Sequence, residues 1–361
     1  MIDAIYIHIP FCEKKCYYCD FLSFANKKDE IGKYIEKLIE EIKLYPENTY
    51  KTVYFGGGTP SLIEPKVIKR ILDNLKIEKN AEITFEVNPK TVDEKKLNEL
   101  KEIGINRLSI GCQSFDNEIL KRIGRIHNAE EAINTYEMAR KVGFDNINLD
   151  LIFATPNQSM EKLDKDLEKI IKLNPEHIAI YSLIWEKGTK LWEMEKRGEL
   201  KETDQYIEAD MYEKIIKILK ENGYIHYEIS NFAKKGYESK HNTKYWRNEK
   251  YLGIGLGASG YIDNIRYKNV INFKDYYKMI ENQKRPILEK EIINQKSEEE
   301  YKCMLGLRLL EEGVSIETKE NVKKAEKLID SGYLKIKKDK KYILTSKGVM
   351  LANNVFMEFL E

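Results

Sequence analysis

The sequence predicts an α/β protein built around a parallel sheet, with a small α+β domain at its C-terminal end. Short, nearly continuous apolar runs alternate with stretches whose apolar residues recur at helical spacing. Such runs are typical of strands buried on both faces, and strands that alternate with helices indicate βαβ units. The length of 361 residues fits two domains, or one barrel with an appendage.

The alternation covers residues 1–230, which we expect to form the main domain. Its first strand is the run 4–9, which Pro10 ends, and its first helix covers about 31–42. The other predicted strands are 52–55, 82–87, 106–110, 146–152, 178–184 and 224–229. The other predicted helices cover about 65–76, 93–102, 129–141, 160–172 and 204–221.

The alternation stops at the end of that domain. Residues 231–290 are rich in Gly, Asn and Tyr and predict a connecting region of loops and short strands. Residues 291–361 predict a winged-helix-like domain with two helices, a two-stranded ribbon and a last helix. We expect its first helix to begin at a capping box of Ser297 and Glu300 and to end at Gly313.

The charge balance argues against a nucleic-acid partner. The chain has 61 Lys and Arg against 60 Asp and Glu, a net charge of +1, whereas nucleic-acid binding normally leaves a basic footprint. Apolar runs stay far short of the 18 or so residues that a membrane span needs. The N-terminus lacks the basic and apolar regions of a signal peptide. We therefore expect a cytoplasmic protein without a membrane span.

Three of the five cysteines form a cluster, Cys12-x3-Cys16-x2-Cys19, directly after the first strand. Clustered thiols in an intracellular chain indicate metal or redox chemistry rather than a disulfide scaffold. A structural zinc site would need a fourth ligand, which His8 offers. An iron–sulfur cube held by three cysteines would instead leave one iron open to another ligand. The two remaining cysteines stand in apolar segments and are predicted to be small buried side chains.

The segment YIHIPFCEKKCYYCDF, residues 6–21, resembles the signature of radical S-adenosylmethionine enzymes, in their coproporphyrinogen III dehydrogenase-like branch. This resemblance implies a partial (β/α)6 TIM-like barrel, with which the alternation of strands and helices agrees. It implies a [4Fe-4S] cluster on the three cysteines, whose open iron binds S-adenosylmethionine. Reduction of the sulfonium would then release methionine and a 5′-deoxyadenosyl radical.

The resemblance assigns further residues to the cofactor one by one. The glycines of GGGTP, after the second strand, let a backbone approach a ligand closely, although they also fit a tight turn. Positions expected at the first S-adenosylmethionine are Tyr6, Gly57, Gly58, Thr59 and Glu86. Positions that match contacts to a second S-adenosylmethionine are Tyr18, Gln113, Arg125, Asp150 and Ser182. Without the resemblance, Glu86 also fits a solvated strand end and Asp150 a buried polar network.

Within the branch, two features separate the chain from the dehydrogenases. Those enzymes have a further cysteine two residues after the third, where this chain continues with Asp20-Phe21. They also carry an N-terminal arm ahead of the first strand, which here begins almost at the first residue. The segment His241-Asn-x-x-Tyr245-Trp246 instead resembles the signature of the HemW family of heme chaperones. His241 would then be a heme-iron ligand, with the two aromatic rings over the macrocycle. The same three residues also fit a loop pinned onto the barrel.

The sequence therefore predicts a heme chaperone on a [4Fe-4S] and S-adenosylmethionine scaffold, with heme as its cargo. Expected partners are a heme-acceptor protein, respiratory or membrane-associated, and an electron donor such as a flavodoxin or ferredoxin. The alternative is an oxygen-independent coproporphyrinogen III dehydrogenase, which forms protoporphyrinogen IX by radical oxidative decarboxylation. A relative that acts by radical methylation or heme degradation, and a zinc-stabilised α/β domain, also remain open.

Overall fold

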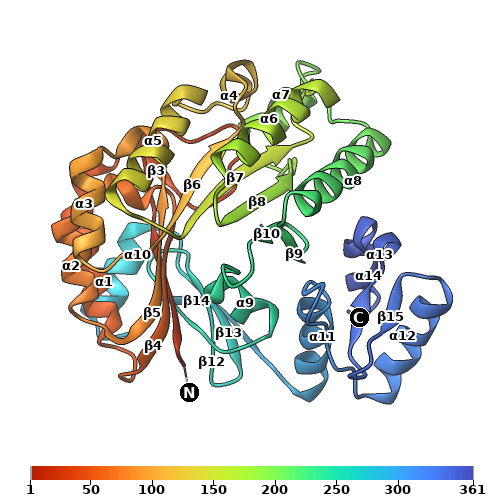
Figure 1. The fold of residues 1–361 in the computed structure, drawn as a ribbon. Coiled ribbons are helices and arrows are strands. Elements are labelled where there is room, and N and C mark those ends of the chain that lie inside the picture. Colours follow the sequence, from red (N-terminus) through yellow and green to blue (C-terminus); the bar gives the residue numbers. More distant parts are fainter. Residues whose placement is uncertain (1, 361) are drawn as a thin grey trace.

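The computed structural model describes residues 2–360 and is organised around a nine-stranded sheet with the order β11-β1-β4-β5-β6-β7-β8-β10-β9 (Figure 1). Neighbours from β11 to β8 are parallel, whereas β10 is antiparallel to both β8 and β9. The strands are β1 (Ala4–Ile9), β4 (Thr49–Gly57), β5 (Lys76–Val87), β6 (Arg107–Gln113), β7 (Ile147–Phe153), β8 (His177–Ser182), β9 (Ile225–Glu228), β10 (Asn231–Ala233) and β11 (Leu252–Ile254). The predicted α/β fold with a parallel sheet is confirmed.

Helices lie in the connections between the parallel strands, and Figure 1 shows α1, α2, α3 and α5 on the outer side of the curved sheet. The main-domain helices are α1 (Ile31–Ile42), α2 (Pro65–Leu72), α3 (Glu94–Glu102), α4 (Asn117–Arg122), α5 (Ala129–Val142), α6 (Met160–Leu173), α7 (Lys190–Lys196) and α8 (Gln205–Glu221). Smaller elements are β2 (Phe11–Cys12), β3 (Phe24–Ala25), η1 (Lys28–Glu30), η2 (Pro60–Leu62) and η3 (Pro89–Thr91). Asn128 and Glu131 form a capping box on α5, which fixes where that helix begins.

The core lies between the sheet and its outer helices. Successive side chains of a strand point to opposite faces, so every second residue of each strand faces the helices. In β6 these residues are Leu108, Ile110 and Cys112, all with no exposed area. The strand register aligns them with apolar neighbours, since Phe85 pairs with Leu108 and Leu108 pairs with Ile147. The other residues of each strand face the inside of the curved sheet.

Residues 231–290 are more regular than the sequence predicts. Strands β10 and β11 extend the main sheet, so that sheet continues past residue 230 on both of its sides. The other elements of this region are α9 (Lys240–Trp246), β12 (Ser259–Ile262), β13 (Ile265–Asn269), α10 (Phe273–Glu281) and β14 (Ile287–Ile292). The order β12-β13-β14 forms a separate antiparallel sheet.

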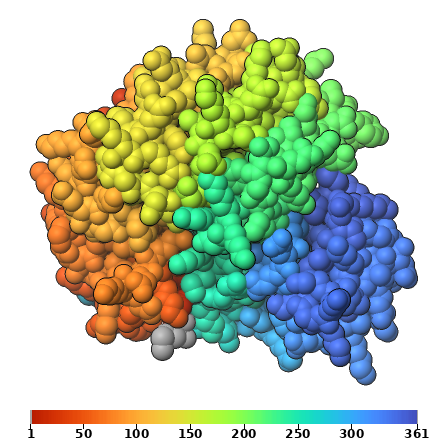
Figure 2. All heavy atoms as spheres, viewed as in Figure 1, coloured from red at the N-terminus to blue at the C-terminus, as the bar shows by residue number. Residues whose placement is uncertain are grey.

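The C-terminal residues have a core of their own. They contact β9, where Leu310 N donates to Tyr227 O at 2.9 Å, and Figure 2 shows the blue region in contact with the green one. Their elements are α11 (Gln295–Gly306), α12 (Lys319–Asp330), β15 (Leu334–Ile336), β16 (Tyr342–Leu344), α13 (Ser346–Met350) and α14 (Ala352–Met357). Two helices, a ribbon and further helices occur in the predicted order. Their kinship with winged-helix domains stays a prediction.

The predicted ends of α11 are wrong. Asn294, not Ser297, is its N-cap, and Ser297 is the partner that completes the capping box. The helix ends at Gly306, where Val314 packs so closely that a Cβ atom on residue 306 would lie 2.7 Å from it. Gly313 instead has a φ of +69° in the turn just before Val314.

A buried carboxylate on α1 joins the main domain to the region after it. Glu41 has no exposed area, and its two oxygens accept hydrogen bonds from Gly255 N (2.8 Å), Tyr276 Oη (2.6 Å) and Asn269 Nδ2 (2.8 Å). These three donors come from the turn after β11, from α10 and from β13.

Among the helices of residues 2–360, none has both the length and the apolar character of a membrane span.

We predict that Glu41→Ala lowers the free energy of unfolding by about 3 kcal/mol or more, because it leaves buried donors without an acceptor. Urea unfolding followed by circular dichroism measures the change. Glu40→Ala is the matched control, since Glu40 is a partly exposed neighbour on the same helix that pairs with Lys37. Equal unfolding midpoints for the two variants would contradict this role of Glu41.

Candidate cofactor site

A cavity of about 470 Å³ opens where the parallel strands of the barrel end. Its rim comes from the loops after the strands, namely the cysteine loop after β1, the Thr59 turn after β4 and Ile184 after β8. Parallel α/β barrels place their sites at this end, and the volume lies in the range of small-molecule sites. The cavity continues inward between the strands, where Ser109, Asp150 and other inward-facing residues line it.

The inner wall of the cavity is polar because the inward-facing rows of the strands are polar. One such row crosses β5, β6, β7 and β8. The strand register pairs Glu86 with Ser109, Ser109 with Asn148, and Asn148 with His177. Hydrogen bonds connect them, from Asn148 Nδ2 to Ser109 Oγ (2.8 Å) and between His177 Nδ1 and Asn148 Oδ1 (2.6 Å). The strands thus hold polar side chains at fixed positions around the cavity.

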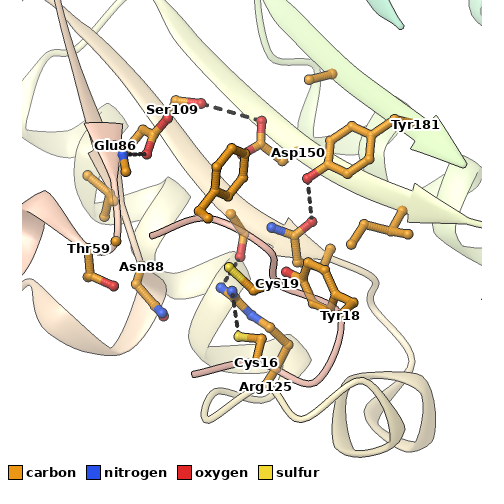
Figure 3. A pocket seen from close by; sticks show the side chains of 18 of the residues that line it. Cys16, Tyr18, Cys19, Thr59, Glu86, Asn88, Ser109, Arg125, Asp150 and Tyr181 are labelled. Carbon is orange, nitrogen blue, oxygen red and sulfur yellow. Dashed lines mark hydrogen bonds between the residues drawn. The ribbon is translucent and has the colours of Figure 1, made fainter. Parts of the chain in front are cut away.

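The cysteine loop forms one side of this cavity. Cys12, Cys16 and Cys19 are free thiols and all three line it. Burial raises the pKa of Cys12 and raises that of Cys19 to about 11. Arg125, from the segment after α4, partly opposes the rise for Cys12, because its positive charge lowers the pKa of that thiol. Its Nη1 also donates to Cys16 Sγ at 3.5 Å. Figure 3 shows the two sides of the cavity, with Cys16, Tyr18, Cys19 and Arg125 together and Glu86, Ser109, Asp150 and Tyr181 on the strands across from them.

The glycine segment after β4 lies beside the cysteine loop. Gly57 has a φ of +113°, and a Cβ atom there would lie 2.5 Å from the His8 ring. A Cβ atom on Gly58 would lie 2.7 Å from the carbonyl oxygen of Phe11. The packing of the protein itself therefore requires glycine at both positions. This is a second reason for the glycines, beside the predicted close approach of a ligand to the backbone. Thr59 follows, with its Oγ1 3.4 Å from Cys12 Sγ.

Two carboxyl groups line the inner part of the cavity. Glu86 accepts hydrogen bonds from Tyr54 Oη (2.9 Å) and Gly57 N (3.2 Å), and burial raises its pKa to about 7. Burial also raises the pKa of Asp150 to about 6, although hydrogen bonds from Asn148 and Ser109 act to lower it. Glu86 is therefore no solvated strand end, and Asp150 belongs both to a polar network and to the cavity.

Gln113 ends β6 in an uncommon conformation. Its φ of +69° is in the left-handed region, which non-glycine residues rarely adopt and which costs free energy unless the surroundings impose it. The side chain points into the cavity, where its Oε1 accepts a hydrogen bond from Tyr181 Oη at 3.3 Å. Arg125 supports the same strand end by donating from Nη2 to Gly111 O at 2.7 Å.

The structure brings most of the sequence-predicted residues together. Those that line the cavity are Cys12, Cys16, Tyr18, Cys19, Gly57, Gly58, Thr59, Glu86, Gln113, Arg125, Asp150 and Ser182. Those that do not line it are Tyr6, His241, Tyr245 and Trp246. Tyr6 faces the barrel interior, where its hydroxyl meets His8 Nδ1 at 3.0 Å.

The residues expected at heme lie on α9, apart from the cavity lining. His241 has no exposed area, and its ring nitrogens are hydrogen-bonded to Thr52 Oγ1 (2.9 Å) and Tyr245 Oη (2.7 Å). Trp246 instead packs against the C-terminal residues, with the Arg308 guanidinium 4.2 Å from its ring centre. In this conformation the three residues serve as packing, and heme ligation by His241 stays a prediction.

Several polar residues of the cavity were not predicted from the sequence, among them Arg107, Ser109, Asn148 and Asn88. The signal was present in β6, where Arg107, Ser109, Gly111 and Gln113 alternate with apolar residues at the period of a strand. Asn88 Oδ1 is buried on the cavity without a hydrogen-bond partner, so an acceptor remains available to a ligand.

The chain is similar to known proteins over nearly its whole length. Residues 6–170 match the Radical SAM superfamily. The heme chaperone HemW of Lactococcus lactis is 41% identical, over 99% of this chain and 97% of that protein. HemW of Bacillus subtilis is 35% identical, over 99% of both. The structure of coproporphyrinogen III oxidase (HemN) from Escherichia coli, a radical SAM enzyme, superposes on this chain with a TM-score of 0.85. The match covers 99% of this chain and 90% of that one at 23% identity, and it shows a common fold.

The barrel and its three-cysteine loop define a member of the radical SAM superfamily. Within that superfamily, the chain belongs to the HemW family. Membership implies a [4Fe-4S] cluster and S-adenosylmethionine, and the residues present fit both groups.

The donor set favours a cluster over a single zinc ion. His8 does not line the cavity, and both of its ring nitrogens are already hydrogen-bonded, to Tyr6 Oη and to Leu22 O. Within residues 2–360, no group of three or more His, Cys, Asp or Glu residues is placed to hold one metal ion. A cube needs no such convergence, since each cysteine binds a different iron. Three thiols without a fourth protein ligand leave one position open for S-adenosylmethionine.

We predict that the anaerobically reconstituted protein binds about four irons and four sulfides. Replacing Cys12, Cys16 or Cys19 by Ala should abolish this binding, as measured by iron and sulfide analysis and by absorbance. Cys112→Ala and Cys303→Ala are matched controls, because both thiols are buried in apolar cores away from the cavity. Stoichiometric zinc that resists replacement by iron would contradict the assignment.

Proposed function

We propose that the protein is a heme chaperone, which binds heme and transfers it to an acceptor protein. The observation that carries this proposal is the 41% identity to the heme chaperone HemW of Lactococcus lactis over nearly the whole of both chains. Because the similarity includes the cavity, the connecting region and the C-terminal residues, it extends well beyond the radical SAM core.

The rim of the cavity supports heme as the cargo. Phe21 and Ile184 line this rim and are 63% and 66% exposed, although apolar side chains of this size are usually buried. Lys14 and Lys15 line the same rim and are exposed. Apolar side chains beside ammonium groups suit a flat apolar macrocycle that carries propionate groups. The rim is thus a better heme contact than α9, where His241 is already hydrogen-bonded.

The cysteine loop and barrel interior would hold the cofactors. Cys12, Cys16 and Cys19 would bind the cluster, and when bound it would supply one-electron chemistry and an open iron for S-adenosylmethionine. Arg125 would offset thiolate charge, while Glu86 and Asp150 accept hydrogen bonds from the ligand inside the cavity. The further partners we propose are a heme-acceptor protein, respiratory or membrane-associated, and a flavodoxin or ferredoxin as electron donor.

A coproporphyrinogen III dehydrogenase is the second candidate, and the fold shared with HemN favours it. The segment Asp20-Phe21 argues against it, because it lines the cavity without the further cysteine that the dehydrogenases have two residues after the third. The two candidates use the same cofactors and differ in what happens to the tetrapyrrole.

We predict that purified protein binds heme with a Soret shift, and that the double variant Phe21→Ser/Ile184→Ser weakens binding about tenfold or more, because apolar contact is lost. Spectrophotometric titration measures the affinity. Ile292→Ser is the matched control, since Ile292 is 71% exposed on β14 and does not line the cavity. Equal affinities for wild type and the double variant would exclude the rim as the heme contact.

The same titration tests His241. From its hydrogen bonds we expect His241→Ala to lower stability and to leave the Soret maximum unchanged. His226→Ala is the control, because His226 is another buried histidine, stacked on Phe232. A Soret change that occurs in His241→Ala but not in His226→Ala would instead establish the ligation that the sequence predicts, and would require α9 to move.

A further inference from the structure

Tyr17 marks the outer side of the cysteine loop. Its two neighbours in the chain, Cys16 and Tyr18, line the cavity, whereas Tyr17 itself does not. Figure 3 shows the cavity side of the loop, where Cys16, Tyr18 and Cys19 lie across from the strands. The Tyr17 side chain is partly exposed. The loop therefore has two sides, one toward the ligands of the cavity and one toward solvent.

The outer side of the loop is held in place by two other segments. Tyr17 N donates to Ile123 O (3.0 Å), and Leu191 N donates to Tyr17 O (2.7 Å). Gly124 has a φ of +80° and lies so close to the Tyr17 ring that a Cβ atom on it would approach the ring to 2.6 Å. The segment after α4 and the start of α7 thus fix Tyr17, and with it the adjacent Cys16.

Two ammonium groups lie over the Tyr17 ring. Lys190 Nζ is 3.8 Å from the ring centre, and Lys14 Nζ is 5.4 Å from it. Both lysines are exposed, and neither forms an ion pair with any residue of the described chain, 2–360. Because both groups lie over one ring, they are closer together than the Debye length of about 10 Å at 0.1 M salt and repel each other. The ring face attracts both cations, and an anionic partner would offset their repulsion.

The acids nearby do not neutralise these two ammonium groups. Arg197 lowers the pKa of Glu199 most and holds its carboxylate at 2.5 Å, whereas Lys190 has a smaller effect on that pKa. Within residues 13–21 and 186–193, the other exposed acids are Glu13 and Glu193, which form no ion pair with either lysine, and Asp20 and Glu186, which line the cavity.

The two segments that hold Tyr17 add further positive charge. Lys121 at the end of α4 and Lys187 just before α7 are exposed, and neither forms an ion pair among the described residues. With Lys14 and Lys190 they make four ammonium groups, which outnumber the free carboxylates outside the cavity. The outer side of the loop is therefore positive, in a chain whose net charge is only +1.

We propose that this outer side is the docking surface for an acidic one-electron donor protein. A cluster in the cysteine loop receives its electron from outside, while the inner side of the loop faces the ligands of the cavity. A donor on the outer side is separated from Cys16 by Tyr17 alone and can dock while the cavity is occupied. Complementary charge speeds such an encounter and orients the partner.

The proposed step moves one electron from the donor to the cluster, and no bond forms or breaks. It deepens the proposed function, because it rests on the electron donor named there and gives that partner a place on the chain. It does not rest on heme as the cargo.

The test measures how fast an acidic flavodoxin, in its hydroquinone form, reduces the anaerobically reconstituted full chain, by stopped-flow absorbance at low salt. We expect Lys187→Glu/Lys190→Glu to lower this rate about tenfold or more, because an attractive surface becomes repulsive. Lys14 stays in place, since it also lines the cavity. The matched control is Lys323→Glu/Lys327→Glu, an equal change of charge at two exposed lysines on α12, which should keep the wild-type rate.

Two further readouts separate docking from damage to the loop. Photoreduced deazariboflavin, a small uncharged reductant, should reduce the wild type and Lys187→Glu/Lys190→Glu at equal rates. Added salt should slow the flavodoxin reaction of the wild type toward the rate of the variant, because screening removes the long-range attraction. Equal flavodoxin rates for wild type and variant, or equal losses in the two double variants, would overturn the proposal. Lys190→Gln removes one charge conservatively and decides the question if the double variant binds no iron: a wild-type flavodoxin rate would then overturn it.

Heme titration of the same samples separates this proposal from the proposed function. Lys187 and Lys190 lie outside the cavity, so we expect their double variant to bind heme as the wild type does. Wild type that binds no heme would refute the heme chaperone and leave the comparison of reduction rates decisive. A wild-type cluster that deazariboflavin reduces and flavodoxin does not would overturn the docking surface and leave heme binding unaffected.

Discussion

The two-residue period of the strands is the constraint on which the rest of the structure depends. In a curved parallel sheet covered by helices on its outer side, every second side chain must be apolar, and the others are free to be polar. Strand β6 shows both sets, with Leu108 and Ile110 toward the helices and Ser109 and Gln113 toward the cavity. One register thus builds the core and the cavity together, and a one-residue slip would exchange them.

The open end of the barrel adds what the strands cannot supply. The cysteine loop is fixed by backbone hydrogen bonds from Tyr17 N to Ile123 O (3.0 Å) and from Leu191 N to Tyr17 O (2.7 Å). These bonds tie it to the segments after β6 and β8. The metal-binding loop and the polar rows therefore face one another across a cavity whose geometry comes from several distant parts of the chain.

Local sequence signals made the first strand and the cysteine loop predictable. The first strand has the predicted bounds, Ala4–Ile9, because an apolar run and Pro10 mark it. The cysteine loop was predictable because its three ligands are close in sequence. Contacts between distant segments were not: β11 pairs with β1, and His241 is hydrogen-bonded to Thr52 across 189 residues. The partners of His241, rather than its motif, determine its role in this conformation.

The region after the barrel shows the same limit. Glycine, asparagine and tyrosine predicted loops, yet Glu41 orders this region through three donors that no local pattern brings together. Trp246 packs on Arg308 at the junction with the C-terminal residues, where Leu310 N also donates to Tyr227 O at 2.9 Å. Trp246 thus packs between two parts of the chain in this conformation, and its predicted contact with heme stays a prediction.

The fate of the tetrapyrrole tests the central claim most directly. One anaerobic sample of the reconstituted protein, with S-adenosylmethionine and a reductant, receives heme and an apo-acceptor in one portion and coproporphyrinogen III in another. Chromatography and absorbance follow both tetrapyrroles over time. A heme chaperone transfers heme to the acceptor and leaves coproporphyrinogen III unchanged. Steady, S-adenosylmethionine-dependent formation of protoporphyrinogen IX would contradict the account and show that the cavity is the active site of a dehydrogenase.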